Sequence, residues 1–333
     1  MNFQKLLKVE SYQTYLDFAF NSGKKQAELI RESKFKDKLT KSKNVEIERI
    51  SVVRNTLNSH LGNILRSFPR LDDLPPFYLE LVRITLDYGA LKRSLGAVLW
   101  AIKKSDYFYE GYKNKIKHIS ELNQINEARR DYYGRVSSVM KQIKKELEYL
   151  EEARKIMKSF PMIKTSVKSI CIFGFPNVGK STLLSKITGS TPEIKNYAFT
   201  TKSLNIGYLK NEEFAAKKIQ FIDTPGTLDR FFKMNLIEQQ AYLALKHCCD
   251  GVIFVFDLTE CYSYEKQFML FENLRIIKPN IPIIVYMSKS DMINKTDKLK
   301  IETFVKQFKD KYKVDAVYDK DAVVKKVLSF LDM

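Results

Sequence analysis

Apolar residues recur along the first 160 residues at alternating spacings of three and four positions, which places them along one face of a helix. Breaks in this pattern fall at Asn21-Ser22-Gly23, at Pro69–Pro76 and near Gly111. The pattern predicts a bundle of three or more long helices. Its apolar series are Ile50, Val53, Leu57, Leu61 and Ile64; Leu91, Leu95, Val98 and Ile102; and Val136, Met140, Ile143, Leu147 and Leu150.

The pattern changes after a linker around Phe160-Pro161. Short apolar runs typical of strands then alternate with helical stretches, and this alternation predicts a parallel sheet flanked by helices. We therefore expect an all-α helical bundle domain over residues 1–162 and an α/β domain over residues 163–333, built on a mainly parallel sheet. The predicted strands are Ser169–Phe173, Lys218–Ile222, Gly251–Phe256 and Ile281–Met287.

A phosphate-binding motif follows the first predicted strand. Residues 174–181 read Gly-Phe-Pro-Asn-Val-Gly-Lys-Ser, a full match to the P-loop pattern of G-x-x-x-x-G-K followed by Ser or Thr. The glycines let backbone N–H groups cradle phosphates, Lys180 would reach the β- and γ-phosphates, and the Ser181 hydroxyl would ligate Mg²⁺. The residues expected to line this loop are Phe175, Pro176, Asn177, Val178, Gly179, Lys180, Ser181 and Thr182.

Two further segments would complete the phosphate and Mg²⁺ site. Asp223-Thr-Pro-Gly226 follows the second predicted strand, so that Asp223 would hold Mg²⁺ and the Gly226 N–H would sense the γ-phosphate. Between this box and the P-loop lies a Thr-Thr pair of the kind found in switch loops. Thr201 is our first candidate for the hydroxyl that completes the Mg²⁺ shell, and Thr200 is the second. The expected catalytic residues are Lys180, Thr201 and Gly226.

The base would be recognised by Ser288-Lys289-Ser290-Asp291, which follows the strand Ile281–Met287. In the usual box, Asn or Thr precedes Lys, and the final Asp accepts hydrogen bonds that guanine donates and adenine does not. Asp291 therefore predicts guanine nucleotides, GTP and GDP, and the stem of Lys289 would pack on the purine. Ser288 departs from the pattern.

Residue 227 bears on the rate of hydrolysis. Efficient GTPases often carry Gln directly after the Gly of the Asp-x-x-Gly box, where it orients the attacking water. Here that residue is Thr227, which predicts slow GTP hydrolysis or stimulation by a partner. Asn177 is of a type that can ligate K⁺ beside the phosphates, although a turn-stabilising role explains it equally well.

The charge of the chain points to a polyanionic partner. Lys and Arg outnumber Asp and Glu by 57 to 39, and residues 1–165 alone hold 32 basic and 20 acidic residues, a net charge of +12. Such a field attracts nucleic acid or an anionic membrane surface. Tyr107–Tyr112 followed by Lys113, Lys115, Lys117 and His118 mixes aromatic and basic side chains, so it is the candidate RNA contact.

The remaining features indicate a cytoplasmic monomer without a membrane span. The four cysteines show no metal-ligand spacing, and no apolar run is long enough to cross a bilayer. Reduced cysteines in a cytosolic protein fit this composition.

The motifs together resemble the Obg-related GTPases, and within them the nucleolar G-protein (Nog) family in its shorter, archaeal-type form. The resemblance covers most of residues 45–295, and only the motifs in the helical half separate Nog proteins from their relatives. Departures from the family pattern are Ala198, Thr227, Ser288 and an indistinct fifth nucleotide box. The motifs that carry the resemblance are Gly174–Thr182, Tyr197–Thr201, Asp223–Arg230, Phe68–Tyr78 and Tyr88–Gly96.

This resemblance implies a role in assembly of the large ribosomal subunit. The helical domain would contact ribosomal RNA of the precursor particle, while the GTPase domain would gate binding or release. Two alternatives remain open: an Obg-like regulator of translation or stress, and a non-hydrolysing module that binds partners in a nucleotide-dependent way.

Overall fold

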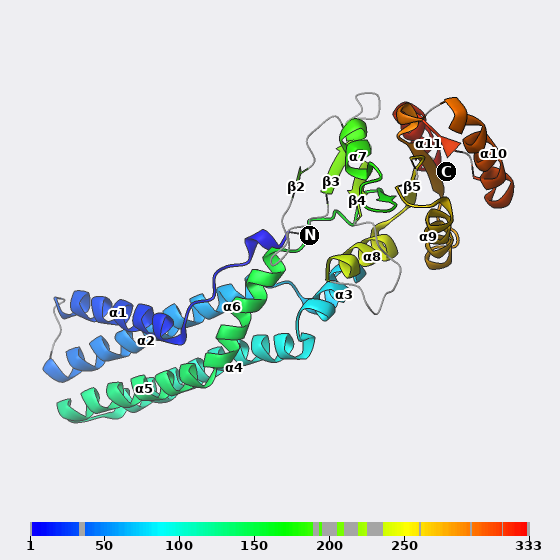
Figure 1. The fold of residues 1–333 in the computed structure, drawn as a ribbon. Coiled ribbons are helices and arrows are strands. Elements are labelled where there is room, and N and C mark those ends of the chain that lie inside the picture. The colour runs from blue at the N-terminus through cyan, green and yellow to red at the C-terminus, as the bar shows by residue number, and fades with distance from the viewer. Residues whose placement is uncertain are drawn as a thin grey trace. The chain divides into compact units, whose positions relative to one another are not determined.

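The computed structural model describes residues 2–32, 37–188, 193–194, 205–209, 219–224, 236–259, 261–293, 295–314 and 316–331 of the chain (Figure 1). Contacts between Cα atoms divide these residues into two compact units. The helical unit comprises Asn2–Leu74 and Val82–Lys158, and the α/β unit comprises Pro75–Leu81 and Ser159–Met333.

Long helices build the helical unit. The predicted apolar face of its second long helix is the core, since all five residues of that series are at most 2% exposed. Helices begin at side-chain caps, as where Asp37 accepts the N–H of Thr40 and Asp87 accepts the N–H of Ala90. The elements are η1 (Phe3–Lys5), α1 (Tyr12–Arg31), α2 (Lys38–Ser67), η2 (Leu71–Asp73), α4 (Tyr88–His118), α5 (Leu122–Gln142) and α6 (Lys144–Lys158), together with the second half of α3 (Pro76–Thr85).

Two of the three predicted helix breaks are wrong. Residues 21–23 lie within α1, and Gly111 lies within α4. Gly23 is a packing residue, because a Cβ there would lie 2.7 Å from the Val53 side chain and 2.9 Å from the Arg49 carbonyl oxygen. The Pro69–Pro76 break is confirmed, since α2 ends at Ser67 and α3 begins at Pro76.

A seven-stranded sheet forms the centre of the α/β unit, in the order β2-β3-β4-β1-β5-β6-β7. β4, β1, β5, β6 and β7 run parallel, and β2 and β3 are antiparallel to their neighbours, which confirms the mainly parallel sheet. The strands are β1 (Ser169–Phe173), β2 (Glu193–Ile194), β3 (Asn205–Leu209), β4 (Ile219–Asp223), β5 (Gly251–Asp257), β6 (Ile283–Ser288) and β7 (Ala316–Val317). The helical elements are α7 (Lys180–Thr188), α8 (Leu236–Cys248), α9 (Tyr264–Ile277), η5 (Ser290–Met292), α10 (Lys295–Tyr312) and α11 (Lys320–Leu331).

The strand order determines where a ligand can bind. β1 lies between β4 and β5, so the chain crosses from one side of β1 to the other. In open α/β sheets, ligands bind at such a switch point, beyond the carboxyl ends of the strands. The carboxyl ends of β1, β4, β5 and β6 therefore frame the candidate site.

The segment Pro75–Leu81 packs with the α/β unit although it lies within the sequence of the helical half. Tyr78 is fully buried, and its hydroxyl lies 2.9 Å from the carbonyl oxygens of both Pro161 and Ile163. Glu80 accepts from Lys246 on α8 at 3.1 Å. The segment lies within the predicted domain of residues 1–162, whereas its contacts group it with residues 159–333.

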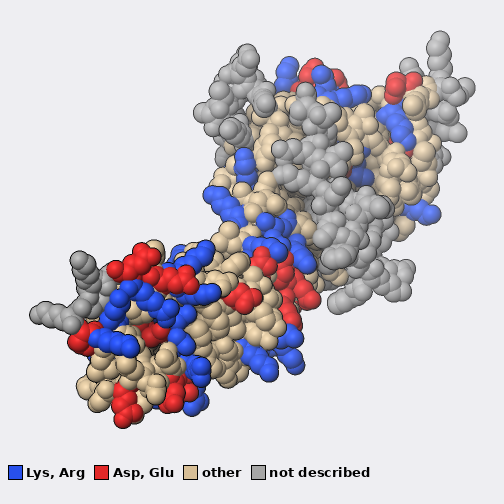
Figure 2. Space-filling view, turned by 90° about the vertical axis from the view of Figure 1, so that its left-hand side faces the viewer, with Lys and Arg blue, Asp and Glu red and all other residues tan. Residues whose placement is uncertain are grey.

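Charged residues of both signs cover the surface. On the face shown in Figure 2, Lys and Arg lie interspersed with Asp and Glu. The ion pair between Lys144 and Glu148 is one example, at 3.8 Å. Within the described residues, no helix combines the length and apolarity that crossing a bilayer requires.

Gly23→Ala should destabilise the helical unit, whereas Gly134→Ala should stabilise it. Both glycines lie inside helices, but a Cβ at Gly134 would meet nothing within 4 Å. Alanine at Gly134 should raise the free energy of unfolding by about 0.5–1 kcal/mol. Alanine at Gly23 should lower it by about 1 kcal/mol or more, because α1 and α2 must separate. Urea unfolding followed by circular dichroism would measure both, and a gain at Gly23 would contradict the close packing.

Candidate nucleotide-binding site

The loop after β1 has the backbone conformation that the P-loop motif predicts. Gly174 and Gly179 have φ of 151° and 99°, in the region that favours glycine. A Cβ at Gly174 would lie 2.5 Å from the Val255 carbonyl oxygen, so this position requires glycine. Asn177 has a left-handed φ of 61°, which Asn adopts more readily than most residues. This conformation accounts for Asn177 as a turn residue, and a role as K⁺ ligand remains a prediction.

Lys180 lies inside the turn of this loop. Its Nζ donates to the carbonyl oxygens of Gly174 at 2.9 Å and Phe175 at 2.6 Å. The residue is 8% exposed, and this burial lowers the pKa of Lys180 to about 8. The Lys180 cation provides positive charge, and the N-terminus of α7 provides free backbone N–H groups. Phosphate groups bind to both.

Ser181 and Asp223 meet beside the loop, as expected for a Mg²⁺ site. The Ser181 hydroxyl donates to Asp223 Oδ2 at 2.5 Å, and Asn205 Nδ2 donates to the same oxygen at 3.2 Å. Asp223 is 6% exposed, and its Oδ1 has no hydrogen-bond partner within the described residues. Burial raises the pKa of Asp223. A hydroxyl beside a carboxylate with a free buried oxygen fits Mg²⁺, which prefers oxygen ligands.

Asn205 also contacts this site, although no sequence motif marks it. Asn205 begins β3 and lies opposite Asp223 in the antiparallel register of β3 and β4. A single Asn at the start of a short strand carries no recognisable signal, because its role depends on strand pairing. The register alone brings its amide to the carboxylate.

The predicted base-recognition residues follow the end of β6. The Ser288 hydroxyl donates to the Phe256 carbonyl oxygen at 3.0 Å, so this departure from the usual pattern anchors the loop to β5. Lys289 has a left-handed φ of 57°. Asp291 lies exposed in η5, where its carboxylate is accessible to a base.

Asp257 holds Lys289 in place, although sequence reasoning missed it. Its side chain is fully buried at the end of β5, and Oδ2 lies 2.7 Å from Lys289 Nζ. Oδ1 accepts from the Thr259 N–H at 2.9 Å and the Thr259 hydroxyl at 2.7 Å. Gln267 bonds both the N–H and the carbonyl of Asp257. An acidic residue that ends an otherwise apolar strand was the available signal.

The electrostatics of Asp257 keep this ion pair charged at neutral pH. Burial raises the pKa of its carboxyl, but the bonds from Lys289 and Thr259 outweigh burial, so the pKa lies below its usual value. A carboxylate whose pKa is lowered stabilises the fold above its unfolded pKa, and this stabilisation is lost only as the pH falls through the folded pKa. The position of Lys289 should therefore not change between pH 5 and 8.

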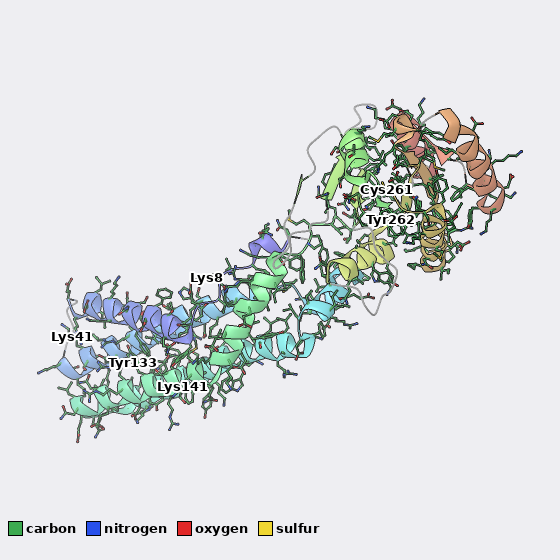
Figure 3. All side chains as sticks on the ribbon, in the orientation of Figure 1. Lys8, Lys41, Tyr133, Lys141, Cys261 and Tyr262 are labelled. Carbon is green, nitrogen blue, oxygen red and sulfur yellow. The ribbon has the colours of Figure 1, made fainter. Side chains whose placement is uncertain are left out.

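An aromatic stack connects the P-loop to the segment after β5. The rings of Phe175 and Tyr262 lie 4.3 Å apart at an interplanar angle of 15°. Tyr262 and Cys261 are labelled in Figure 3 within the α/β unit. Because Asp257 and Tyr262 belong to one short segment, that segment supports both Lys289 and the outer part of the P-loop.

The remaining predicted residues are only partly described. Val178 is buried, Pro176 is half-buried, and Thr182 is exposed in the first turn of α7. Thr200, Thr201 and Gly226 lie outside the described residues, as does Thr227.

Comparison with known proteins identifies the family. Residues 3–164 match a family model described as the NOG1 N-terminal helical domain, and residues 169–289 match one described as a 50S ribosome-binding GTPase. The chain is 34% identical to an uncharacterized protein of Methanocaldococcus jannaschii, over 83% of this chain and 77% of that protein. The chain belongs to the NOG1 family.

Other NOG1 relatives are longer. The nucleolar GTP-binding protein 1 of Drosophila melanogaster is 31% identical over 89% of this chain but 45% of its own length. A solved structure described as nucleolar GTP-binding protein 1 of Plasmodium falciparum aligns over 52% of this chain and 90% of that chain, at 25% identity and a TM-score of 0.39. The chain spans about half the length of the nucleolar relatives it matches. Its α/β unit matches the GTPase family model.

Asp257→Asn should weaken GDP binding about tenfold without changing the preference for guanine. The substitution removes the charge that holds Lys289, and hydrogen bonds to charged groups contribute about 1.5–3 kcal/mol. Asp291→Ala should instead reduce the discrimination between GDP and ADP. Calorimetric titration with both nucleotides would separate the two effects.

Asp250→Asn provides a matched control for Asp257. Asp250 also pairs with a lysine, Lys168 at 2.8 Å, but it immediately precedes β5, so it lies at the opposite end of that strand from Asp257. This variant should bind GDP with unchanged affinity. Equal losses in the two variants would show that general destabilisation, rather than the position of Lys289, causes the effect.

Proposed function

We propose that this protein is a GTP-binding switch with slow intrinsic GTPase activity that acts in assembly of the large ribosomal subunit. The observation that carries the proposal is the combination within one chain: a P-loop with Ser181 and Asp223 in contact, joined to a basic unit that matches the NOG1 N-terminal helical domain. The description of the matched GTPase family as 50S ribosome-binding supports the same partner.

The proposed roles follow from the geometry of the site. Lys180 would neutralise the β- and γ-phosphates, while Ser181 and Asp223 would hold Mg²⁺, which supplies positive charge against the charge that develops on the phosphates. Asp291 accepts hydrogen bonds from guanine, and the stem of Lys289, held by Asp257, packs on the purine. Thr201 and Gly226 are proposed to respond to the γ-phosphate, and their positions lie outside the described residues.

A switch is favoured over a metabolic enzyme by the residues around the phosphates. Thr227, rather than Gln, directly follows Gly226, so the chain lacks at this position the usual group for orienting the attacking water. A protein that hydrolyses GTP slowly stays in its GTP state until a partner supplies the missing group. This behaviour suits a factor that leaves a particle only after a step of assembly.

The free protein should hydrolyse GTP at about 10⁻³ s⁻¹ or less, in line with GTPases that await a partner. Lys180→Ala should abolish the residual rate, because it removes the buried cation of the P-loop. Single-turnover measurements of phosphate release would test both statements. Turnover of several GTP per second by the free protein would mean that the chain carries its own catalytic group.

Sedimentation of the full chain with cell extract tests the proposed partner. In sucrose gradients run with GDP, GTP or a non-hydrolysable GTP analogue, the protein should co-sediment with large-subunit particles, and the amount should depend on the nucleotide. Association with complete ribosomes alone would favour an Obg-like translation regulator. Equal association in all three states, without hydrolysis, would favour a non-hydrolysing binding module.

A further inference from the structure

One face of α4 carries exposed aromatic and basic side chains. We call this the α4 face, and it comprises Arg93, Gly96, Trp100, Lys103, Lys104, Tyr107 and Gly111. Successive residues of this set are three or four positions apart, except for the adjacent pair Lys103 and Lys104. All seven therefore lie on the same side of the helix. All seven are exposed, and none is acidic.

The aromatic side chains of the α4 face are exposed to an unusual degree. Trp100, the single tryptophan of the chain, is 36% exposed, and Tyr107 is 68% exposed. Leu99 beside them is 45% exposed. Large apolar groups that gather on one surface mark an interaction site more often than isolated ones do.

The cations of this face are available to a partner. Within the described residues Lys103 forms no ion pair, and Lys104 contacts only the Tyr107 ring, at 5.5 Å. Arg93 lies 3.8 Å from Asp87, and both side chains are largely exposed, so this pair is weak. Three basic side chains thus share this face with two aromatic rings.

Part of the sequence-predicted RNA contact, residues 107–118, is engaged within the protein. Lys113 lies 3.4 Å from Glu110, and Lys115 lies 3.6 Å from Asp131. The ring of Tyr109 is buried. Tyr107, the exposed aromatic residue of that predicted contact, belongs to the α4 face, whose other basic and aromatic groups precede it along the helix.

Two glycines on the α4 face have no internal explanation. A Cβ at Gly96 or Gly111 would meet nothing within 4 Å, and neither residue has a positive φ. Glycine inside a helix costs about 0.5–1 kcal/mol of stability relative to alanine, mainly because its unfolded backbone is more flexible. Close approach of a partner's backbone is one use of the missing side chain.

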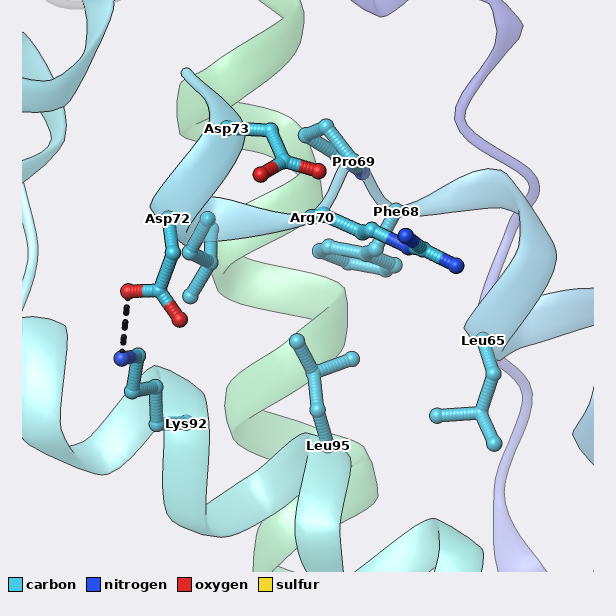
Figure 4. A pocket seen from close by; sticks show the side chains of 9 residues that line it. Leu65, Phe68, Pro69, Arg70, Asp72, Asp73, Lys92 and Leu95 are labelled. Carbon is cyan, nitrogen blue, oxygen red and sulfur yellow. Dashed lines mark hydrogen bonds and ion pairs between the residues drawn. The ribbon is translucent and has the colours of Figure 1, made fainter.

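Near the N-terminal end of the α4 face lies a surface hollow whose lining includes carboxylates. This hollow of about 370 Å³ is lined in part by Phe68, Arg70 and Leu95 (Figure 4). Asp72 bonds Lys92 across it at 2.6 Å, and Asp73 also lines it. Carboxylates are therefore present here, whereas the carboxylates nearest the α4 face are Asp87, which pairs weakly with Arg93, and Glu110, which pairs with Lys113.

We propose that the α4 face binds single-stranded RNA, with a base stacked on Trp100 and phosphates held by Lys103, Lys104 and Arg93. This inference rests on the proposed ribosomal function and names the surface that would contact RNA. Aromatic rings among cations are the usual means of binding unpaired nucleotides. The excess of positive charge on this face favours RNA over a protein segment, because a segment that is not strongly acidic would leave Lys103 and Lys104 without partners of opposite charge.

The fluorescence of the full chain provides a direct test, because Trp100 is its only tryptophan. Titration with a single-stranded RNA of about 12 nucleotides, within the usual range of such sites, should quench this fluorescence. Heparin, a polyanion without bases, should bind without comparable quenching. RNA binding that leaves the fluorescence unchanged, or equal quenching by heparin, would overturn the proposal.

Substitutions identify the contributing groups. Trp100→Ala should weaken RNA binding about tenfold, as expected for loss of one stacked base. Replacing Lys103 and Lys104 by Gln should reduce the slope of log affinity against log salt by about 1.4, since each phosphate contact contributes about 0.7 with single strands. Replacing Lys24 and Lys25 by Gln changes the charge equally at another exposed adjacent pair and should leave the slope unchanged.

Sedimentation separates failure of this inference from failure of the proposed function. If Trp100→Ala still co-sediments with large-subunit particles and binds RNA normally, the α4 face is not the RNA contact. If Trp100→Ala no longer co-sediments with large-subunit particles, while RNA leaves the fluorescence of the unmodified chain unchanged, the face binds a protein instead. If the unmodified chain binds no particle, the ribosomal function itself fails.

Discussion

The nucleotide site depends on how closely the loop after β1 approaches the end of β5. No side chain fits at Gly174, because the Val255 carbonyl oxygen occupies the space. This approach closes the loop around Lys180 and brings its carbonyl oxygens to the ammonium group. It also brings Phe175 onto Tyr262 and sets the loop beside the segment that holds Lys289. The phosphate and base subsites are thereby built on one pair of neighbouring strands.

The conformation of the loop after β1 could be predicted from the sequence because short-range geometry determines it. The glycines and Lys180 of the P-loop act within a few residues of one another, so their spacing alone carries the information. Asp257 and Asn205 were missed because each works through a partner that only the sheet brings near. Strand register, rather than any local pattern, defines these two contacts.

The same distinction explains the errors in the helical half. The apolar series predicted the buried face of α2, and on α4 the buried Leu91 and Val98, because burial follows helical periodicity. Gly23 and Gly111 were interpreted as breaks because glycine is a poor helix former. In the structure, Gly23 allows two helices to pack closely and Gly111 lies on an open surface. Both uses depend on what lies across from the residue, which a single sequence does not show.

The position of Pro75–Leu81 has a consequence for how the chain folds during synthesis. This segment leaves the ribosome before the second half of the helical unit, yet its Tyr78 hydroxyl finds its carbonyl partners only at Pro161 and Ile163. The helical unit can therefore complete its core while one internal segment still waits for residues made much later. Folding of the two units is interleaved along the chain, and cutting the polypeptide near residue 160 would deprive the α/β unit of a buried tyrosine.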